Sequence, residues 1–389
     1  MSNKPILGIS MGDPFGNGPE ITVKALAGLR EATAPRSDTA DLPNAALPAG
    51  VRESGSLADK SVYDRCRPLV VGDVSCMEYA AKVAKKVSGI DVKIRPIKSV
   101  NDAKFEFGTI DVYDMGLIKP SDIPGDPEHP APFKLGATKL GGEAAYQYVV
   151  KVIHMALNKE VDATITNALS KEAINMAGHH YSGHTEIYAD ETKTSKYGMM
   201  LAHGDLRVVH VSTHVSLREA CDRVKKDRVL DCIRLANDAC RALGIKEPKI
   251  GVAGLNPHCG EDGMFGWEDI EEIQPAIDQA LGEGINIPEK KPTPPDTVFS
   301  KALGGWYDIV VVMYHDQGHI PLKLKGFVYN KAEKRWDAVA GINVTLGLPI
   351  IRASVDHGTG FGHAGDGGAN ALSLLNAMDY GIRLAENRK

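Results

Sequence analysis

Short apolar segments that read as buried strands recur along the chain, and three of them are followed by a histidine. These histidines are His214 (after 206–211), His258 (after 250–255) and His315 (after 309–313). A histidine at a strand end lies at the rim of its sheet, where open α/β sheets bind ligands. One histidine in such a position is more often a hydrogen-bonded loop residue. Three in the same kind of position favour a divalent-metal site that leaves room for a substrate.

The wider pattern alternates strands with helices, which favours a mixed sheet covered by helices on both faces. Ile6–Ser10 reads as a strand, and a glycine-rich turn at 12–18 leads into a helix that begins at Pro19. Further strands are expected at 69–72, 92–97 and 163–166. Further helices are expected at 142–158, 269–281 and 370–387, and two helical segments within 217–243. A chain of 389 residues is long enough for two domains, or for one large α/β unit with insertions.

Two segments read as insertions. Residues 32–65 are rich in Ala, Pro, Ser and Asp without lasting periodicity, which predicts a flexible or partner-facing excursion. Residues 328–338 have a central turn between short apolar ends, which predicts a hairpin.

The bulk composition excludes several classes of protein. The formal net charge is -5 and no stripe is dense in Lys and Arg, which argues against a nucleic-acid partner. The six cysteines include no Cys-x-x-Cys pair and are expected to be reduced. No leader or bilayer-length apolar stretch is present, so we expect a cytoplasmic protein without a membrane partner.

Several polar residues stand where an anionic ligand could bind. His184 and Thr185 lie where a loop enters a helix, and free backbone N–H groups there attract anions; the alternative is that Thr185 caps the helix. Lys323, Asn343 and Arg352 form a second set. The two cations lie in apolar stretches and need an anionic partner, unless they extend to water from a strand edge.

Two residues are candidates for proton transfer. Lys171 follows the strand at 163–166, and a lysine acts as a base only if burial or neighbouring cations lower its pKa. Asp296 precedes a helical stretch and is either a catalytic carboxylate or a helix cap. The glycine-rich loop 354–360 could hold a nucleotide, although neither the dinucleotide fingerprint nor a P-loop is present.

Taken together, these stretches resemble the 4-hydroxythreonine-4-phosphate dehydrogenase family. The resemblance covers nearly the whole chain outside the two insertions. It rests on ordered motifs at 12–20, 183–186, 213–214, 254–258, 296–297, 314–318, 343–349 and 354–359.

The resemblance implies an isocitrate/isopropylmalate dehydrogenase-like fold, a three-layer α/β/α arrangement with two domains around a cleft. It also implies a homodimer in which the partner completes the active site. We expect a nucleotide-binding domain of residues 1–140 plus 306–389. A second domain, 141–305, is expected to carry the metal ligands and the dimer contacts.

In such a family the enzyme oxidises a secondary alcohol of a small anionic substrate with NAD or NADP, and the β-keto acid then loses carbon dioxide. The resemblance assigns the metal to His214, His258 and His315, and the substrate to His184, Thr185, Lys323, Asn343 and Arg352. We expect Asn256, Asp356, Gly358 and Thr359 to contact the cofactor, and Lys171 and Asp296 to act in catalysis. The divalent ion is zinc, cobalt, nickel, manganese or magnesium.

Departures from the family pattern leave the substrate open. Ser170-Lys171-Glu172 stands where vitamin-pathway members carry His-Lys-Gly, and Phe15 and Asn17 stand in the glycine turn. The substrate is then 4-hydroxythreonine-4-phosphate, a threonate- or erythronate-4-phosphate, or a cis-dihydrodiol of an aromatic dicarboxylate. A non-catalytic metal- or sugar-acid-binding protein is the alternative from another class.

Overall fold

The computed structural model describes residues 4–28, 61–330, 335–339 and 341–388. Most of the predicted insertion 32–65 lies outside these residues, and its last part forms the short helix α2 (Val62–Arg65). Within the described part of the chain, no helix is both long and apolar enough to span a lipid bilayer.

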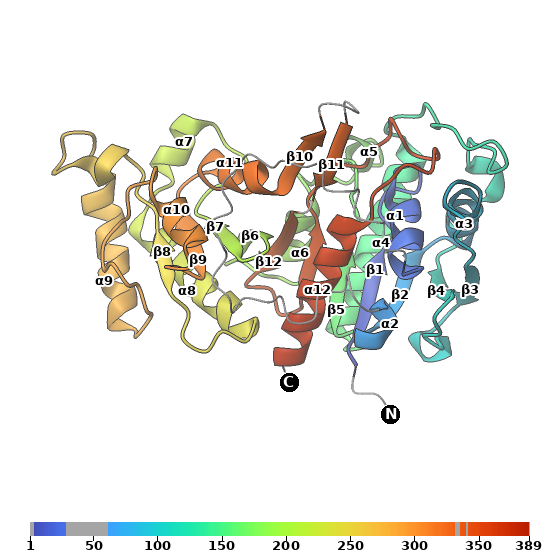
Figure 1. The fold of residues 1–389 in the computed structure, drawn as a ribbon, viewed down its shortest axis with the longest axis horizontal. Helices are drawn as coiled ribbons and strands as arrows, with labels where there is room; N and C mark the ends of the chain where they lie inside the picture. The colour runs from blue at the N-terminus through green and yellow to red at the C-terminus, as the bar shows by residue number, and fades with distance from the viewer. Residues whose placement is uncertain (1–3, 29–60, 331–334, 340, 389) are drawn as a thin grey trace, which may run out of the picture.

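The core of the molecule is one mixed β-sheet. Its strands are β1 (Ile6–Ser10), β2 (Arg67–Gly72), β3 (Lys93–Ile97), β4 (Thr109–Asp114), β5 (Ala163–Thr166), β6 (Gly198–His203), β7 (Leu206–His210), β8 (Ile250–Val252), β9 (Ile309–Val312), β12 (Ile342–Leu346) and β13 (Arg352–Val355). Among the described residues these strands lie in the order β3-β4-β2-β1-β5-β13-β12-β6-β7-β9-β8 (Figure 1). The strands from β3 to β13 run parallel, and β12 is antiparallel to both of its neighbours.

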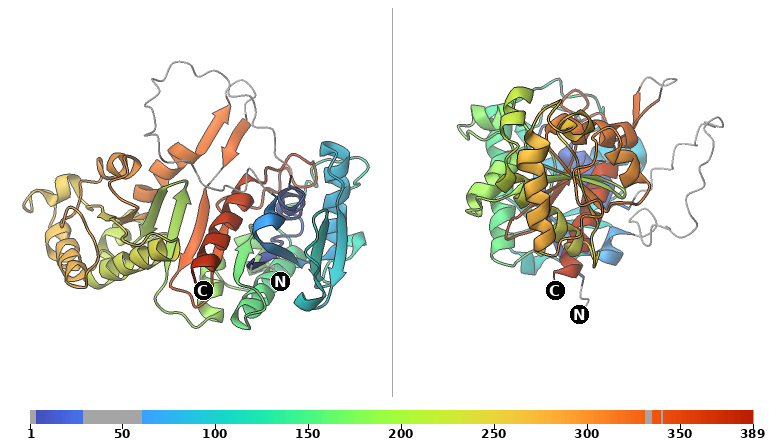
Figure 2. Two further views of the ribbon diagram at one scale, coloured as in Figure 1. Left: turned by 60° about the horizontal axis from the view of Figure 1, so that its bottom comes forward. Right: turned by 90° about the vertical axis from the view of Figure 1, so that its left-hand side faces the viewer.

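Helices cover both faces of this sheet (Figures 1 and 2). They are α1 (Gly18–Leu26), α3 (Val74–Ser88), α4 (Lys139–Leu157), α5 (Lys171–Met176), α6 (His184–Glu191), α7 (Leu217–Asp222), α8 (Lys226–Ala242), α9 (Gln274–Gly282), α10 (Val298–Leu303), α11 (His315–Gly326) and α12 (Leu372–Asn387). Gly8 of β1 faces Val152 of α4, whereas Ile165 of β5 faces Gly381 of α12 on the opposite side. The predicted three-layer α/β/α arrangement is therefore confirmed.

The strands that precede the three histidines are neighbours. β7 runs parallel to β9, and β9 runs parallel to β8. The segments that hold His214, His315 and His258 therefore leave this part of the sheet from the same end.

The third of these strands is shorter than predicted. β8 ends at Val252, whereas the apolar segment continues to Leu255. Ala253 and Gly254 still donate to the carbonyl oxygens of Val311 (2.9 Å) and Thr293 (2.8 Å). The ladder stops after them, because the Asp269 carboxylate accepts from the backbone N–H groups of Leu255 (2.9 Å) and Asn256 (3.1 Å). A backbone donor held by a side chain is not available to a strand ladder.

The predicted hairpin is confirmed. β10 (Phe327–Asn330) pairs antiparallel with β11 (Arg335–Val339) between α11 and β12, and the pair projects away from the sheet (Figure 2). The division into two domains stays a prediction. β5 lies within the predicted domain 141–305, and it pairs with β1 and β13 of the other predicted domain.

Candidate active site

Two of the predicted metal ligands lie side by side. The ring centroids of His214 and His315 are 5.6 Å apart. His315 opens α11, and its Nδ1 lies 2.6 Å from the Asp316 carboxylate. A carboxylate in that position holds the proton on Nδ1 and leaves Nε2 as a lone-pair donor, which is how metal-binding histidines are oriented.

The third predicted ligand, His258, is not brought to this pair. Its loop has left-handed backbone at His258 (φ 53°) and Cys259 (φ 57°), and its ring lies 6.3 Å from that of Phe265. Across the described ranges, no three His, Cys, Asp or Glu side chains are grouped closely enough to hold a metal ion. The set of three histidines therefore stays a prediction, of which the structure assembles two members.

Two further histidines extend the pair, and the strand-end pattern predicts neither of them. The ring of His319 stacks on that of His315, and its Nδ1 lies 2.8 Å from the His315 carbonyl oxygen. The ring of His210 follows at 4.8 Å from His319. Burial lowers the pKa of His319 to about 4 and that of His210 to about 3, so both are neutral at pH 7. On a helix, residues four apart lie on the same face. A predicted helix at 315–326 would therefore have placed His319 beside His315.

The most unusual charge in the molecule is that of Arg352, which begins β13 in the centre of the sheet. The buried guanidinium donates to the Thr345 hydroxyl (2.7 Å) and the Thr166 hydroxyl (3.2 Å) and lies over the Tyr188 ring. Its Nε has no partner, and no carboxylate of the described residues forms an ion pair with it. Burial lowers the pKa of Arg352 to about 10, so the group stays charged at neutral pH. A buried cation without an anion favours binding of an anionic ligand.

Two more polar atoms without partners accompany this guanidinium. His184 is the first residue of α6, and its Nε2 is buried without a partner. The pKa of His184 lies well below its usual value because of burial and, secondarily, the charge of Arg352. Asn343 of β12 pairs with Ser354 of β13, which is two residues after Arg352, so Asn343 and Arg352 lie on the same face of the sheet. The Oδ1 of Asn343 also lacks a hydrogen-bond partner. The guanidinium of Arg352 is the group in this polar site that fits an anion, and His184 lies close enough for its charge to act on the imidazole.

Thr185 and Lys323 lie at the margin of this arrangement. Gly183 is the N-cap of α6, so Thr185 is the second helical residue and does not cap the helix. Lys323 lies on α11 and is exposed. It lines a small hollow together with Asp356. Burial raises the pKa of Asp356 to about 6, and the nearby charges of Lys323 and His315 oppose this rise, so Asp356 lies near both groups.

The two glycine-rich segments lie against each other. The backbone N–H of Asn17 donates to the Thr359 carbonyl oxygen at 2.8 Å. A Cβ at Gly16 would lie 2.7 Å from the same oxygen, so this approach requires glycine. The predicted nucleotide loop with Gly358 and Thr359 therefore packs on the turn that precedes α1.

The remaining predicted residues lie in separate places. Lys171 is exposed at the start of α5. The pKa of His214 is lowered by burial and, secondarily, by the charge of Lys171, so Lys171 lies near the histidine pair. Asn256 is engaged by its own loop, since its amide donates to Glu268 (2.8 Å). Asp296 is exposed before Thr297, the N-cap of α10, and no hydrogen bond or ion pair within the described residues joins it to Lys171.

This fold and this site belong to a known class of metabolic enzymes. Residues 64–381 match the family described as pyridoxal phosphate biosynthetic protein PdxA. The chain is 39% identical over 385 residues to a D-threonate 4-phosphate dehydrogenase from Cupriavidus necator, which covers 99% of this chain and 98% of that protein.

Solved structures agree with this assignment. A 4-hydroxythreonine-4-phosphate dehydrogenase from Klebsiella pneumoniae superposes with a TM-score of 0.75 at 34% identity, over 98% of this chain and 100% of that one. A terephthalate 1,2-cis-dihydrodiol dehydrogenase from Burkholderia xenovorans LB400 gives 0.58 at 26% identity, over 99% of each chain. The chain therefore belongs to the PdxA family, and the dehydrogenase names of its relatives confirm the prediction of an oxidoreductase.

Proposed function

We propose that the protein oxidises a secondary alcohol of a small phosphorylated hydroxy acid with NAD or NADP, and that D-threonate 4-phosphate is the substrate. The observation that supports this most directly is the buried Arg352 guanidinium, which has no carboxylate partner among the described residues and has the unpartnered His184 Nε2 nearby. Guanidinium groups bind phosphate and carboxylate by charge-assisted hydrogen bonds. The Cupriavidus necator relative is named for this substrate.

The other predicted contacts complete the proposal. Thr185, Lys323 and Asn343 would contact the substrate beside Arg352. Asp356, Gly358 and Thr359 would contact the cofactor, with Asn256 at the edge of its loop. The packing of Thr359 on Asn17 supports this, because it brings the two glycine-rich backbones together.

We also propose a divalent metal ion at His214 and His315, with His258 as a third ligand. Two of the three proposed ligands are placed to bind one ion, because the imidazoles of His214 and His315 lie side by side and Asp316 orients that of His315. His258 would join only after a rearrangement of its loop. Such an ion supplies a Lewis acid that lowers the pKa of a bound hydroxyl group.

The reaction needs two transfers and one bond cleavage. The alcohol carbon transfers a hydride to the nicotinamide, while the hydroxyl proton passes to a base. Lys171, near His214, is our candidate for this base, and Asp296 is the second candidate. Oxidation at the carbon β to the carboxylate gives a β-keto acid. The bond to the carboxylate then breaks, carbon dioxide leaves, and its electron pair forms an enolate that takes up a proton.

A homodimer with a shared active site is part of the proposal. It is supported by large apolar side chains exposed in and after the loop that carries His258, among them Met264 (73% exposed) and Trp267 (55% exposed). Exposed apolar groups of this size are typical of protein–protein contacts. Sedimentation of the purified protein tests it, and a monomer at micromolar concentration would contradict it.

The substrate is tested by NADH or NADPH formation at 340 nm, with each candidate divalent ion added in turn. The panel is D-threonate 4-phosphate, 4-hydroxythreonine 4-phosphate and a terephthalate cis-dihydrodiol, with unphosphorylated D-threonate as the control. We expect turnover of D-threonate 4-phosphate together with release of carbon dioxide. Turnover of the dihydrodiol alone would favour the second enzymatic candidate. No turnover of any compound would favour a binding protein.

A further inference from the structure

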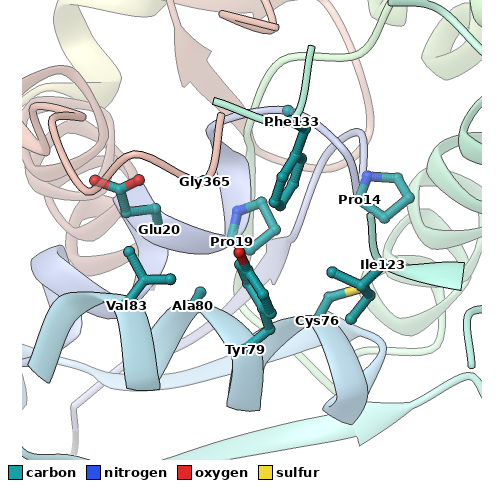
Figure 3. A pocket seen from close by; sticks show the side chains of 11 residues that line it. Pro14, Pro19, Glu20, Cys76, Tyr79, Ala80, Val83, Ile123, Phe133 and Gly365 are labelled. Atoms are coloured by element: carbon teal, nitrogen blue, oxygen red, sulfur yellow. The ribbon is translucent and has the colours of Figure 1, made fainter. Parts of the chain in front are cut away.

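One cavity outside the site lies between α3, the start of α1 and the segment around Phe133 (Figure 3). The rings of Tyr79 and Phe133 contact each other there, with centroids 5.4 Å apart and 58° between the ring planes. The space that these side chains leave takes little more than a water molecule. The first turn of α6, in contrast, borders open space beside the proposed substrate contacts.

This turn of α6 carries three polar residues in succession. His184 and Thr185 are proposed substrate contacts, and Glu186 follows them. Glu186 is half-buried, and within the described ranges its carboxylate forms neither a hydrogen bond nor an ion pair. The function proposed above gives this carboxylate no role.

The surroundings of Glu186 belong to the same site. The Arg352 guanidinium lies 5.4 Å from the centroid of the Tyr188 ring, which projects from the same helix. A Cβ added at Gly183, the N-cap of α6, would meet only Glu186 Oε2 at 3.7 Å and Lys171 Cε at 3.9 Å. Glu186 and Lys171 therefore border a space at Gly183 that no other side chain of the described residues fills.

The charge of Glu186 reaches two groups of the site. Burial lowers the pKa of His214, and Lys171 adds to this effect, whereas Glu186 opposes it. Burial lowers the pKa of Arg352 to about 10, and Glu186 is one of two groups that oppose that fall. Glu186 therefore lies near both the histidine pair and the buried guanidinium, and in the described part of the chain it forms an ion pair with neither.

A carboxylate in this place restricts which part of a ligand it can face. Like charges a few ångströms apart repel each other, so Glu186 does not suit the phosphate or carboxylate group that Arg352 attracts. It suits a hydroxyl or ammonium group, because an ionised carboxylate only accepts hydrogen bonds. In D-threonate 4-phosphate the hydroxyl left for this contact is that at C2, because the hydroxyl at C3 is the one that is oxidised.

We propose that Glu186 accepts a hydrogen bond from the substrate hydroxyl at C2, and that it selects phosphorylated acids with a hydrogen-bond donor at this carbon. This inference rests on the proposed function and deepens it. An ammonium group at C2, as in 4-hydroxythreonine 4-phosphate, also donates. Glu186 therefore distinguishes ligands with a donor at C2 from ligands that carry only hydrogen there.

The test compares the binding of two ligands by isothermal titration calorimetry, without NAD or NADP. They are D-threonate 4-phosphate and its 2-deoxy analogue, which lacks only the C2 hydroxyl. The wild-type protein should bind the first about ten- to a hundredfold more tightly, the range for a hydrogen bond to a charged group. Glu186→Ala should lose this preference, and Glu186→Gln, which keeps a neutral acceptor, should retain part of it.

The 2-deoxy analogue separates loss of one contact from a general loss of the site. Both substitutions remove a negative charge near Arg352, so they should leave the affinity for this analogue unchanged or raise it. Its binding also reports that each variant is folded, and if one variant does not fold, the other carries the test. Glu191→Gln is the matched control, because Glu191 ends the same helix and pairs with His154 at 2.9 Å. It should leave the affinity for both ligands unchanged.

Equal weakening of both ligands in the Glu186 variants would overturn the inference, since it would show a structural role. A wild-type protein that binds the two ligands equally well, or binds neither, would overturn it too. Failure of the dehydrogenase function alone gives a different result. The preference for the C2 hydroxyl would then depend on Glu186, while neither ligand was oxidised after addition of NAD or NADP.

Discussion

The imidazole ring of His319 stacks on that of His315, with 3.6 Å between the ring centroids and 12° between the ring planes. The two residues are one helical turn apart on α11, and the Nδ1 of His319 also lies 2.8 Å from the His315 carbonyl. His319 therefore limits the orientation of a ring that we propose as a metal ligand.

We predict that His319→Ala lowers kcat/KM and metal affinity by about ten- to a hundredfold, the usual effect of losing a residue that supports a ligand. His319→Phe keeps a stacked ring but lacks the ring nitrogens. Its kcat/KM and metal affinity should lie between those of the wild type and of His319→Ala. Metal content by elemental analysis, together with steady-state kinetics, measures both effects. Wild-type values for His319→Ala would show that the stack is incidental.

The metal ligands are tested one at a time. We expect about one equivalent of divalent metal in the wild-type protein and far less in His214→Ala, His315→Ala and His258→Ala. His129 is exposed in a loop outside the site, and His129→Ala is the matched control. Full metal occupancy in His258→Ala would remove that residue from the site and leave His214 and His315 as the pair.

Replacement of Arg352 separates binding from stability. Arg352→Gln should reduce kcat/KM for the phosphorylated substrate about tenfold or more, because a charge-assisted contact is worth roughly 1.5–3 kcal/mol. The free energy of unfolding should stay the same or rise, since the variant removes a buried charge that has no carboxylate partner among the described residues.

Arg207 provides the control for this experiment. It is also a buried arginine, but it pairs with Asp205 at 2.8 Å and bonds to the Tyr380 hydroxyl. Arg207→Gln should lower the melting temperature and leave KM for the substrate unchanged. Inorganic phosphate should raise the Tm of the wild-type protein and of Arg207→Gln, but not of Arg352→Gln. A Tm rise in Arg352→Gln equal to that of the wild type would place the anion elsewhere.

The hairpin β10–β11 is predicted to influence substrate choice. It joins α11, which carries Lys323, to β12, which carries Asn343. Replacement of residues 328–338 by a short glycine-containing turn should leave the fold and the metal content intact and change the order of substrates in the panel. An unchanged order and unchanged rates would make the hairpin peripheral to specificity.

Asp13 is expected to make stability depend on pH. Its carboxyl group is buried, one oxygen accepts from the Phe15 N–H, and burial raises the pKa of Asp13 to about 6. A raised carboxyl pKa means that the folded state binds the proton more tightly, so the stabilisation present near pH 4 is lost as the pH rises through about 6.

Asp13→Asn removes this dependence. At pH 8 the variant should be more stable than the wild type by about 1–3 kcal/mol, and near pH 4 the difference should become small. Denaturant titrations at both pH values measure the effect, and Asp222→Asn at the exposed end of α7 is the control. A difference of the same size at both pH values would show that the charge of Asp13 is not responsible.

Local patterns were enough to predict most helices and strands and the pairing of His214 with His315. Both histidines follow parallel neighbouring strands, so their proximity needs only correct strand assignment. The position of His258 depends on a loop held by Asp269, a contact that no periodicity reveals. The cavity at Tyr79 and Phe133 was missed because its walls come from segments more than 50 residues apart, which only the folded chain brings together.

The order of strands at the centre of the sheet also determines when the fold can be completed during synthesis. β13 pairs with β5 on one side, and β12 pairs with β6 on the other, so this hairpin-like pair is the only bridge among the described strands between the two halves of the sheet. Both strands lie after residue 341, near the end of the chain. Until the ribosome releases that last segment, β5 and β6 are open edges that other nascent chains can pair with. The residues that close this gap include Arg352, so a chain truncated before them would expose the edges of β5 and β6 and would also lack the buried guanidinium.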